Sequence, residues 1–339
     1  MTALRYLEAA LRDAGAIELR CCRGEFWASG LYCDLDLLRA AIRERAGRGN
    51  LYITLNRPCP DVPVPNGAAR PLTDADIERV VRIPVDFDPA RPRESMATAE
   101  ELALAVAARD RFVSAMLASG WPMPLTAMSG SGAHAVFRCS IPASAELREM
   151  LDAVYAGWRR DFGSERVGFD CKVRNPSRVF RLYGTMNRKG ANTPERPWRR
   201  ASCALPAAGW QAVQLKQIEA LANRYARTEP RRAPAPRQPI SGAGDYRTLD
   251  VVALMRGHGL YKRAMGGRKH AVTCPWAAEH STDDHPLRSD SVVWEPKPGE
   301  WPGFYCSHGH CEGRTIRALI EWAGDADAYC ARAWARAAA

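Results

Sequence analysis

The chain has 339 residues, of which 46% are hydrophobic and 25% charged, so it can bury ordinary cores and is not disordered throughout. Its 48 Lys and Arg outnumber its 38 Asp and Glu, giving a formal net charge of +10 that favours polyanionic partners such as nucleic acid, nucleotides or an anionic membrane surface. No stretch approaches the roughly 18 uninterrupted apolar residues of a membrane-spanning helix, and the N-terminus has no signal-peptide pattern.

The first 225 residues mix predicted helices and strands. Leu4, Leu7 and Leu11 fall on one face of a predicted N-terminal amphipathic helix. Further helices are predicted at residues 98–120 and 144–163, the first with a capping box between Thr98 and Glu101. Strands are predicted at residues 51–55, 80–88, 133–141 and 179–183. This interleaving predicts an α/β or α+β domain.

A linker is predicted at residues 226–245, between a domain at 1–225 and a smaller one at 246–339. Residues 227–240 contain four prolines and four arginines, a composition typical of extended, semi-rigid backbone. The eleven cysteines are odd in number and mostly scattered, which favours a reducing cytoplasm and metal binding over a disulfide framework. The chain lacks the Gly-x-x-x-x-Gly-Lys-Ser/Thr phosphate loop, so an internal ATPase motor is not expected.

Two carboxylates end the predicted strand at 80–88. Strand side chains alternate, so Val85 and Phe87 should point to one face and Asp86 and Asp88 to the other. Two carboxylates roughly 7 Å apart repel each other unless a cation lies between them, and hard ions such as Mg²⁺ or Mn²⁺ take oxygen ligands of this kind. A solvated strand end is the alternative interpretation of an isolated Asp-x-Asp pattern.

A glycine-rich turn precedes the strand at 133–141. Ser129, Gly130, Ser131 and Gly132 allow backbone N–H groups to converge on one anion, and His134 at the start of the strand can contribute to the same site. A plain turn with a surface histidine is the alternative.

A third carboxylate, Asp170, is followed by a strongly basic segment. Residues 172–200 hold nine Lys and Arg and one acid, a net charge of +8 within the chain's +10. Arg178 and Arg181 are three residues apart, so on an extended strand only one of them should face a given site. Apolar residues interrupt the segment, so it must pack against the protein.

These segments together resemble the archaeo-eukaryotic primase superfamily, specifically the primase-polymerases of phages and mobile elements. The motifs are IPVDFDPARP, SGSGAH, FDCKVRNPSRVFRLYGTMNRKG and RPWRR, within residues 50–200. The resemblance implies an α+β fold, with an RRM-like core of mixed sheet and flanking helices, that joins nucleotides on a DNA template. It implies that Mg²⁺ or Mn²⁺ binds Asp86, Asp88 and Asp170, and that nucleotide or template contacts Ser129, Gly130, Ser131, Gly132, His134, Arg178, Arg181 and Lys189.

The expected partners are single-stranded DNA, NTPs or dNTPs, and a separate replicative helicase, in the cytoplasm of a bacterial or phage-infected cell. The residues suit nucleotidyl transfer independently of the family, because two metal ions, a phosphate-binding turn and basic groups supply the positioning and charge neutralisation that this chemistry needs.

The C-terminal domain carries a predicted structural Zn²⁺ site. Cys274 and His280 form one ligand pair and Cys306 and Cys311 the other, with residues 290–295 and 303–306 predicted to form the hairpin of a zinc ribbon. His308, His310 and His285 are alternative ligands. The segment also resembles the zinc-binding part of phage primases if Cys306, His308 and Cys311 are matched, and its expected role is template capture or initiation.

Three other functions fit parts of the sequence. A non-catalytic DNA-binding replication-initiator module would share the basic charge and the zinc ribbon, but would gain nothing from three carboxylates. A nicking enzyme of the His-hydrophobic-His class is disfavoured because glycine separates His308 from His310. A bacterial-type primase is disfavoured because no Glu-Gly motif precedes Asp86 and the cysteines lie at the other end of the chain.

Overall fold

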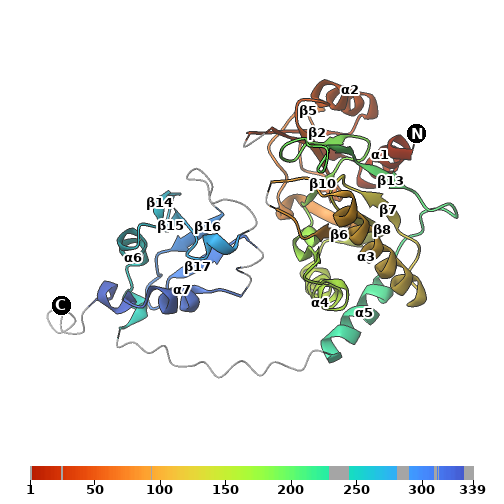
Figure 1. The fold of residues 1–339 in the computed structure, drawn as a ribbon. Coiled ribbons are helices and arrows are strands. Elements are labelled where there is room, and N and C mark those ends of the chain that lie inside the picture. The colour runs from red at the N-terminus through yellow and green to blue at the C-terminus, as the bar shows by residue number, and fades with distance from the viewer. Residues whose placement is uncertain are drawn as a thin grey trace. The chain divides into compact units, whose positions relative to one another are not determined.

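The computed structural model describes residues 2–23, 26–92, 94–228, 244–280, 290–308, 311 and 313–331. The chain divides into two compact units, Met1–Pro230 and Arg231–Ala339 (Figure 1). The expected domains at 1–225 and 246–339 each fall within one unit. Most of the expected linker, residues 229–243, lies outside the described residues.

The first unit contains a five-stranded antiparallel sheet with the strand order β10-β3-β1-β2-β5. Its strands are β1 (Ile17–Arg23), β2 (Phe26–Tyr32), β3 (Asn50–Thr54), β5 (Gly67–Ala68) and β10 (Val179–Arg181). The strands predicted at 51–55 and 179–183 are thus present, and they pair with each other. This pairing places β10, a part of the basic segment at residues 172–200, beside β3 from the N-terminal part of the chain.

A second sheet has the order β13-β7-β8-β6-β4, with β9 also paired to β6. Its strands are β4 (Arg57–Pro58), β6 (Ile77–Pro89), β7 (Leu125–Met128), β8 (Ala133–Pro142), β9 (Val167–Phe169) and β13 (Ser202–Ala204), and a separate short ladder joins β11 (Met186–Asn187) to β12 (Arg199–Arg200). The expected mixed sheet is wrong, because every ladder between the described strands is antiparallel. The chain does return so that β7 runs parallel to β6, but β8 lies between them and pairs antiparallel with both.

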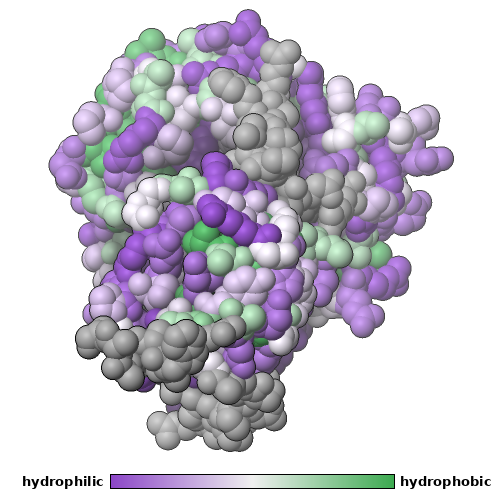
Figure 2. Space-filling model, turned by 90° about the vertical axis from the view of Figure 1, so that its left-hand side faces the viewer, coloured by the Kyte–Doolittle hydropathy of each residue, from purple (hydrophilic) through white to green (hydrophobic). Residues whose placement is uncertain are grey.

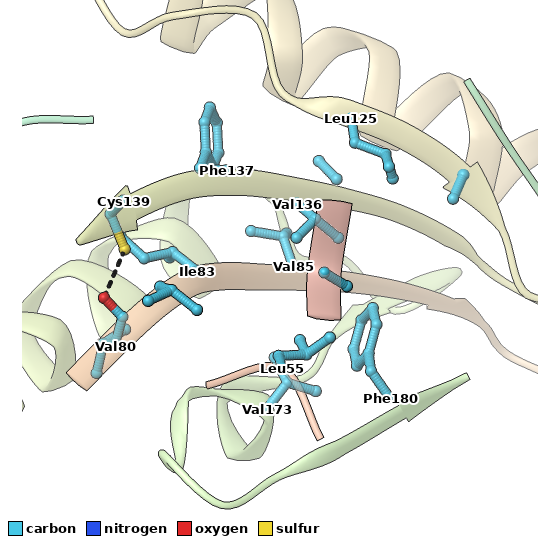
Figure 3. Close-up of a cluster of buried hydrophobic side chains, with 14 of the residues drawn as sticks. Leu55, Val80, Ile83, Val85, Leu125, Val136, Phe137, Cys139, Val173 and Phe180 are labelled. Carbon is cyan, nitrogen blue, oxygen red and sulfur yellow. Dashed lines mark hydrogen bonds between the residues drawn. The ribbon is translucent and has the colours of Figure 1, made fainter. Parts of the chain in front are cut away.

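Helices α3 (Ala99–Ala118) and α4 (Ala145–Phe162) cover one face of this second sheet (Figure 1). The predicted capping box is present, with the Thr98 amide donating to Glu101 Oε2 and the Glu101 amide donating to Thr98 Oγ1. Phe112 of α3 packs against Phe87 of β6 and, edge to face, against Trp158 of α4. The buried cluster continues through β6, β7 and β8, where Cys139 donates to the Val80 carbonyl (Figure 3).

The opposite face of β6 meets the N-terminal helix α1 (Thr2–Ala14) through ion pairs. Asp13 accepts from Arg82 at 2.7 Å and from Arg138 at 2.8 Å, and the Arg82 side chain is fully buried. Leu7 and Leu11 of α1 are buried as predicted, but Leu4 is exposed. Helix α2 (Leu35–Arg45) packs on β1 and β2, and helix α5 (Leu215–Thr228) packs on α4.

The second unit is a four-stranded antiparallel sheet whose strands follow chain order. The strands are β14 (Tyr261–Ala264), β15 (Lys269–Val272), β16 (Ser291–Trp294) and β17 (Gly303–Cys306), and the helices are α6 (Val251–Gly257) and α7 (Ile316–Ala323). The predicted hairpin is confirmed by the pairing of β16 with β17. Cys274, Cys306 and Cys311 are part of the buried core of this unit.

On the face that Figure 2 shows, hydrophilic side chains cover most of the visible surface, and hydrophobic ones form small patches between them. Among the described helices, none combines the length and the apolar composition needed to cross a membrane.

Candidate active site and metal centre

The three predicted carboxylates line one cleft of the first unit. The cleft has a volume of about 180 Å³ and lies where the end of β6 meets β10 and the loops on either side of it. Its lining residues are Tyr52, Asp86, Asp88, Arg91, Ser129, Ser131, His134, Asp170, Val173, Arg178, Val179, Phe180, Arg181, Asn187 and Lys189. A larger hollow of about 480 Å³ beside the start of α4 contains none of the residues predicted for the site.

Asp86 is paired with a buried histidine. Asp86 and His134 are direct partners in the β6–β8 ladder, and His134 Nε2 lies 3.3 Å from Asp86 Oδ1. The other ring nitrogen lies 3.0 Å from Tyr183 Oη, and the ring packs against Phe180 with centroids 4.2 Å apart. His134 is therefore enclosed between three side chains instead of lying at the surface.

Asp88 lies two residues further along the same face of β6. Val85 and Phe87 are fully buried, while the side chains of Asp86 and Asp88 are 20% and 51% exposed, as the predicted alternation requires. Desolvation in the cleft and the neighbouring Asp86 carboxylate raise the pKa of Asp88, and Arg91 opposes both effects. Arg91 holds Asp88 through two contacts of 3.1 and 3.3 Å.

Backbone pairing places Asp170 beside Asp86 at the end of β6. Its N–H donates to the carbonyl of Asp86 at 3.1 Å, directly after β9 has paired with the end of β6. Its carboxylate accepts from the Lys172 amide and so begins the short 3₁₀ turn at Cys171–Arg174. Arg178 lies 3.9 Å away, and the side chain of Asp170 is 34% exposed.

The turn at 129–132 closes over the carboxylates with its own amides satisfied. Ser129 N–H donates to the Gly132 carbonyl, Gly130 N–H to Met128 Sδ, and the amides of Ser131 and Gly132 to Ser129 Oγ. The open anion nest expected from the sequence is therefore not formed, because internal hydrogen bonds use these donors.

Gly132 is nevertheless placed where no side chain fits. A Cβ atom built on it would lie 2.7 Å from Asp88 Oδ1, 2.8 Å from the Phe87 carbonyl and 3.4 Å from Asp86 Oδ1. The turn thus brings backbone directly against both carboxylates, and glycine keeps the space between them open.

Arg178, Arg181 and Lys189 all line the cleft. The expectation that only one of the two arginines could face the site is wrong, because β10 begins after Arg178, whose N–H closes a turn onto the Asn175 carbonyl. Arg181 is 6% exposed and donates to Asn50 Oδ1 and Tyr52 Oη, both at 3.0 Å.

Much of the remaining basic segment has a structural task. Arg196 forms a double ion pair with Glu101, Arg174 pairs with Asp152, and Arg199 and Arg200 donate to backbone carbonyls. The local net charge of +8 is therefore only partly directed at the cleft.

Three polar cleft residues were missed by the sequence analysis: Tyr52, Arg91 and Asn187. Arg91 stands in the quoted IPVDFDPARP motif, three residues after Asp88, and that spacing was the available signal. Asn187 donates through Nδ2 to the Ser129 carbonyl, and its buried Oδ1 has no hydrogen-bond partner among the described residues. Nothing in the sequence distinguished Tyr52 from other strand aromatics.

The second unit brings together a buried cluster of Cys274, His280, Cys306 and Cys311. Their ligand atoms all lie within 4.8 Å of one another. The distances include 3.6 Å from Cys274 Sγ to Cys311 Sγ, 3.2 Å from His280 Nε2 to Cys311 Sγ, and 3.6 Å from Cys306 Sγ to His280 Nε2. Ligands ~2.0–2.3 Å from a tetrahedral Zn²⁺ are separated by about 3.3–3.8 Å, so the cluster can hold zinc.

The alternative ligands have different positions. His308 lies beside the cluster, with Nδ1 3.3 Å from Cys306 Sγ and its ring stacked on His280 at 3.8 Å. His285 and His310 lie outside the described residues.

Comparisons with known proteins give a limited result. No protein-family model and no curated protein matches the chain. Among solved structures, the chain is similar to the crystal structure of primase RepB′, with 14% identity and a TM-score of 0.39 over 66% of this chain and 64% of that one. It is also similar to the catalytic domain of primase RepB′ in complex with initiator DNA, with 12% identity and a TM-score of 0.40 over 68% of this chain and all of that one. The chain thus spans somewhat less than two thirds of the first structure, and at these TM-scores the likeness carries no functional assignment.

Proposed function

We propose that the protein is a DNA-templated nucleotidyltransferase, a primase or primase-polymerase of the archaeo-eukaryotic superfamily, that makes primers on single-stranded DNA. The observation that carries the proposal is the cleft in which Asp86, Asp88 and Asp170 converge beside Arg178, Arg181 and Lys189. Carboxylate side chains can bind cations, and arginine and lysine side chains can bind phosphates. A cleft that contains both therefore suits a nucleotide substrate, which carries phosphates and their bound cations.

The surroundings of Asp86 support the proposal of a divalent metal ion at the three carboxylates. Asp86 Oδ1 is buried and accepts no hydrogen bond from the described residues, although His134 lies nearby. Desolvation in the cleft and the neighbouring Asp86 carboxylate raise the pKa of Asp88, and a bound cation would offset the repulsion between these two carboxylates. Asp86, Asp88 and Asp170 would hold Mg²⁺ or Mn²⁺, which supplies charge neutralisation at the attacking 3′-oxygen and at the leaving pyrophosphate.

The protein groups around the carboxylates orient the reactants. Arg178, Arg181 and Lys189 are positioned to bind triphosphate or template phosphates, since guanidinium and ammonium groups form charge-assisted hydrogen bonds to phosphate oxygens. Arg91 holds Asp88 through two contacts, and His134 Nε2 lies 3.3 Å from Asp86 Oδ1, where the imidazole can orient that carboxylate. The expected direct contact between His134 and triphosphate is replaced in this proposal by a positioning role, because the ring is enclosed.

The second unit would assist initiation. A new primer begins with two unanchored nucleotides, so a zinc-stabilised unit that holds the template or the first nucleotide would help most at that step. A separate helicase and a role in phage or mobile-element replication complete the proposed setting.

The proposal is tested with purified protein, single-stranded DNA, labelled NTPs or dNTPs, and Mg²⁺ or Mn²⁺, with and without a primer. We expect metal-dependent incorporation that follows the template and is lost in Asp86→Asn and Asp88→Asn, with circular dichroism unchanged. Substantial synthesis by these variants would overturn the assignment. DNA binding without incorporation under any of these conditions would favour the alternative, a non-catalytic replication-initiator module.

A further inference from the structure

One face of the five-stranded sheet carries aromatic and basic side chains next to the cleft. The register places Trp27 opposite Cys22, Cys22 opposite Asn50, and Tyr52 opposite Arg181. Because alternate residues of a strand share a face, all five side chains lie on the same side of the sheet. The intervening residues point to the other side and are buried in the core: Cys21, Leu51 and Phe180.

Trp27 is 48% exposed on this face and contacts Tyr52, with ring centroids 5.6 Å apart and planes inclined by 34°. The Arg181 guanidinium lies over the other aromatic ring, 4.4 Å from the centroid of Tyr52. Singly exposed apolar residues are common on protein surfaces, but this one begins a continuous row of Trp27, Tyr52 and Arg181. Tyr52 and Arg181 are cleft residues, whereas Trp27 is not, so the row leads out of the cleft.

Arg181 gives this row a charge that no carboxylate of the described residues neutralises. Its side-chain donors bond to two neutral oxygens, Asn50 Oδ1 and Tyr52 Oη, and among the described residues no carboxylate lies within ion-pair distance. Burying a charge without a counter-ion is costly. An anion at the mouth of the cleft would offset that cost, and a nucleic-acid backbone provides one.

We propose that Trp27 and Tyr52 form a stacking platform for unpaired bases of single-stranded DNA, with Arg181 contacting a backbone phosphate, so that the template is guided to the carboxylates. Every base has an aromatic face, so stacking platforms combined with basic grooves bind single strands with little sequence preference. This inference rests on the proposed function and deepens it by assigning the path of the template.

The position of Trp27 favours the DNA strand over the incoming nucleotide as the occupant. A free nucleotide must place its triphosphate at the carboxylates and basic groups inside the cleft. Trp27 lies outside the cleft lining, so a ligand that reaches it must continue beyond the cleft, as a polynucleotide does.

The test compares Trp27→Ala, Trp27→Phe and the control Leu37→Ala. Leu37 is also 48% exposed and in the same unit, but lies on α2 outside the row, so it controls for the loss of an apolar side chain of equal fractional exposure. The binding of a fluorescent 20-mer of thymidylate is measured by anisotropy at low and moderate salt. All variants carry Asp86→Asn for this measurement, so the result does not depend on catalysis.

Stacking contributes about 1–3 kcal/mol per base, so Trp27→Ala should weaken binding by about 5- to 150-fold. Trp27→Phe should recover most of the affinity, and Leu37→Ala should bind like the parent protein. Equal affinity of Trp27→Ala and Leu37→Ala, or failure of Trp27→Phe to recover binding, would overturn the proposal.

Steady-state kinetics of the same substitutions in otherwise wild-type protein identify the occupant. The nucleotide KM of Trp27→Ala should stay within about 2-fold of wild type while the DNA concentration needed for half-maximal rate increases. A raised nucleotide KM with unchanged DNA affinity would assign the platform to the nucleotide and overturn the proposal. If the protein incorporates no nucleotide at all, the proposed function fails while the binding comparison still decides whether the platform exists.

Discussion

His134 and Asp86 face each other across the β6–β8 ladder, with 3.3 Å between Nε2 of the imidazole and Oδ1 of the carboxylate. Since Tyr183 Oη lies 3.0 Å from the second ring nitrogen and the Phe180 ring packs against the imidazole, the histidine is fixed by these two neighbours. A side chain that is fixed in this way orients its neighbour and does not move to meet a substrate.

We therefore expect His134→Ala to lower kcat more than it raises the nucleotide KM. Tyr183→Phe keeps the aromatic ring but removes one hydrogen bond, which contributes about 0.5–1.5 kcal/mol, so its kcat should fall by about 2- to 13-fold. Steady-state incorporation at varied nucleotide concentration measures both effects. A His134→Ala variant with normal kcat and a strongly raised KM would instead indicate direct triphosphate contact, as first expected from the sequence.

Gly132 tests whether the space between the two carboxylates matters. The added methyl group of Gly132→Ala would lie 2.7 Å from Asp88 Oδ1 and 2.8 Å from the Phe87 carbonyl, so the Asp88 carboxylate or the end of β6 must move. Incorporation should fall at least about 100-fold, since misplacement of reacting groups by about 1 Å has effects of this size. Gly168→Ala is the matched control, because its Cβ would meet only the Asp88 carbonyl, at an ordinary 3.6 Å. Equal activity of the two variants would show that the carboxylates do not act at the position described.

The sequence predicted the carboxylate strand correctly because the evidence for it is local. Alternation alone places Asp86 and Asp88 on one face, and their apolar neighbours Val85 and Phe87 fix which face is buried. The capping box at Thr98 is similarly contained within four residues. Such features depend on neighbours in the chain and are therefore visible in it.

The remaining cleft depends on contacts between distant residues. The enclosure of His134 requires Tyr183, which is 49 positions away, and the partners of Arg181 are on β3, about 130 positions earlier. The separation of charge in the basic segment is also tertiary, because Arg196 is used by Glu101, a residue of the distant helix α3. Composition showed that basic residues are concentrated in this segment. It could not show which of them form structural ion pairs and which line the cleft.

The cluster of Cys274, His280, Cys306 and Cys311 predicts that the stability of the second unit depends on bound zinc. Purified protein should contain about one Zn²⁺ per chain, and Cys306→Ser should lose the metal and lower the melting temperature of this unit, because structural zinc contributes directly to folding. Cys330→Ser is the control, since Cys330 is in the same unit but outside the cluster, and its thiol donates to the Ala326 carbonyl. Elemental analysis measures the zinc content of each variant, and thermal unfolding measures its melting temperature. Freshly purified wild-type protein without zinc, or Cys306→Ser with a full metal content, would contradict the assignment.

Asp13 links the N-terminal helix to the strand that carries the carboxylates, and its ionisation should make stability depend on pH. Burial alone would raise the pKa of Asp13, but ion pairs with Arg138 and Arg82 lower it from 3.8 to about 2. The unfolded chain therefore binds a proton below about pH 4 that the folded one takes up only near pH 2. The stabilisation, on the order of 2 kcal/mol, is fully present above about pH 4 and is lost as the pH falls to about 2.

Asp13→Asn should remove this contribution at neutral pH, and it also leaves the fully buried Arg82 without its acid. We expect destabilisation by about 3–5 kcal/mol at pH 7, measured by urea unfolding of the first unit, with the difference from wild type shrinking between pH 4 and pH 2. Asp36→Asn is the control, because Asp36 is 90% exposed in its ion pair with Arg39 and should change stability by less than about 1 kcal/mol. A pH-independent difference between Asp13→Asn and wild type would show that packing, and not the charge of Asp13, joins α1 to β6.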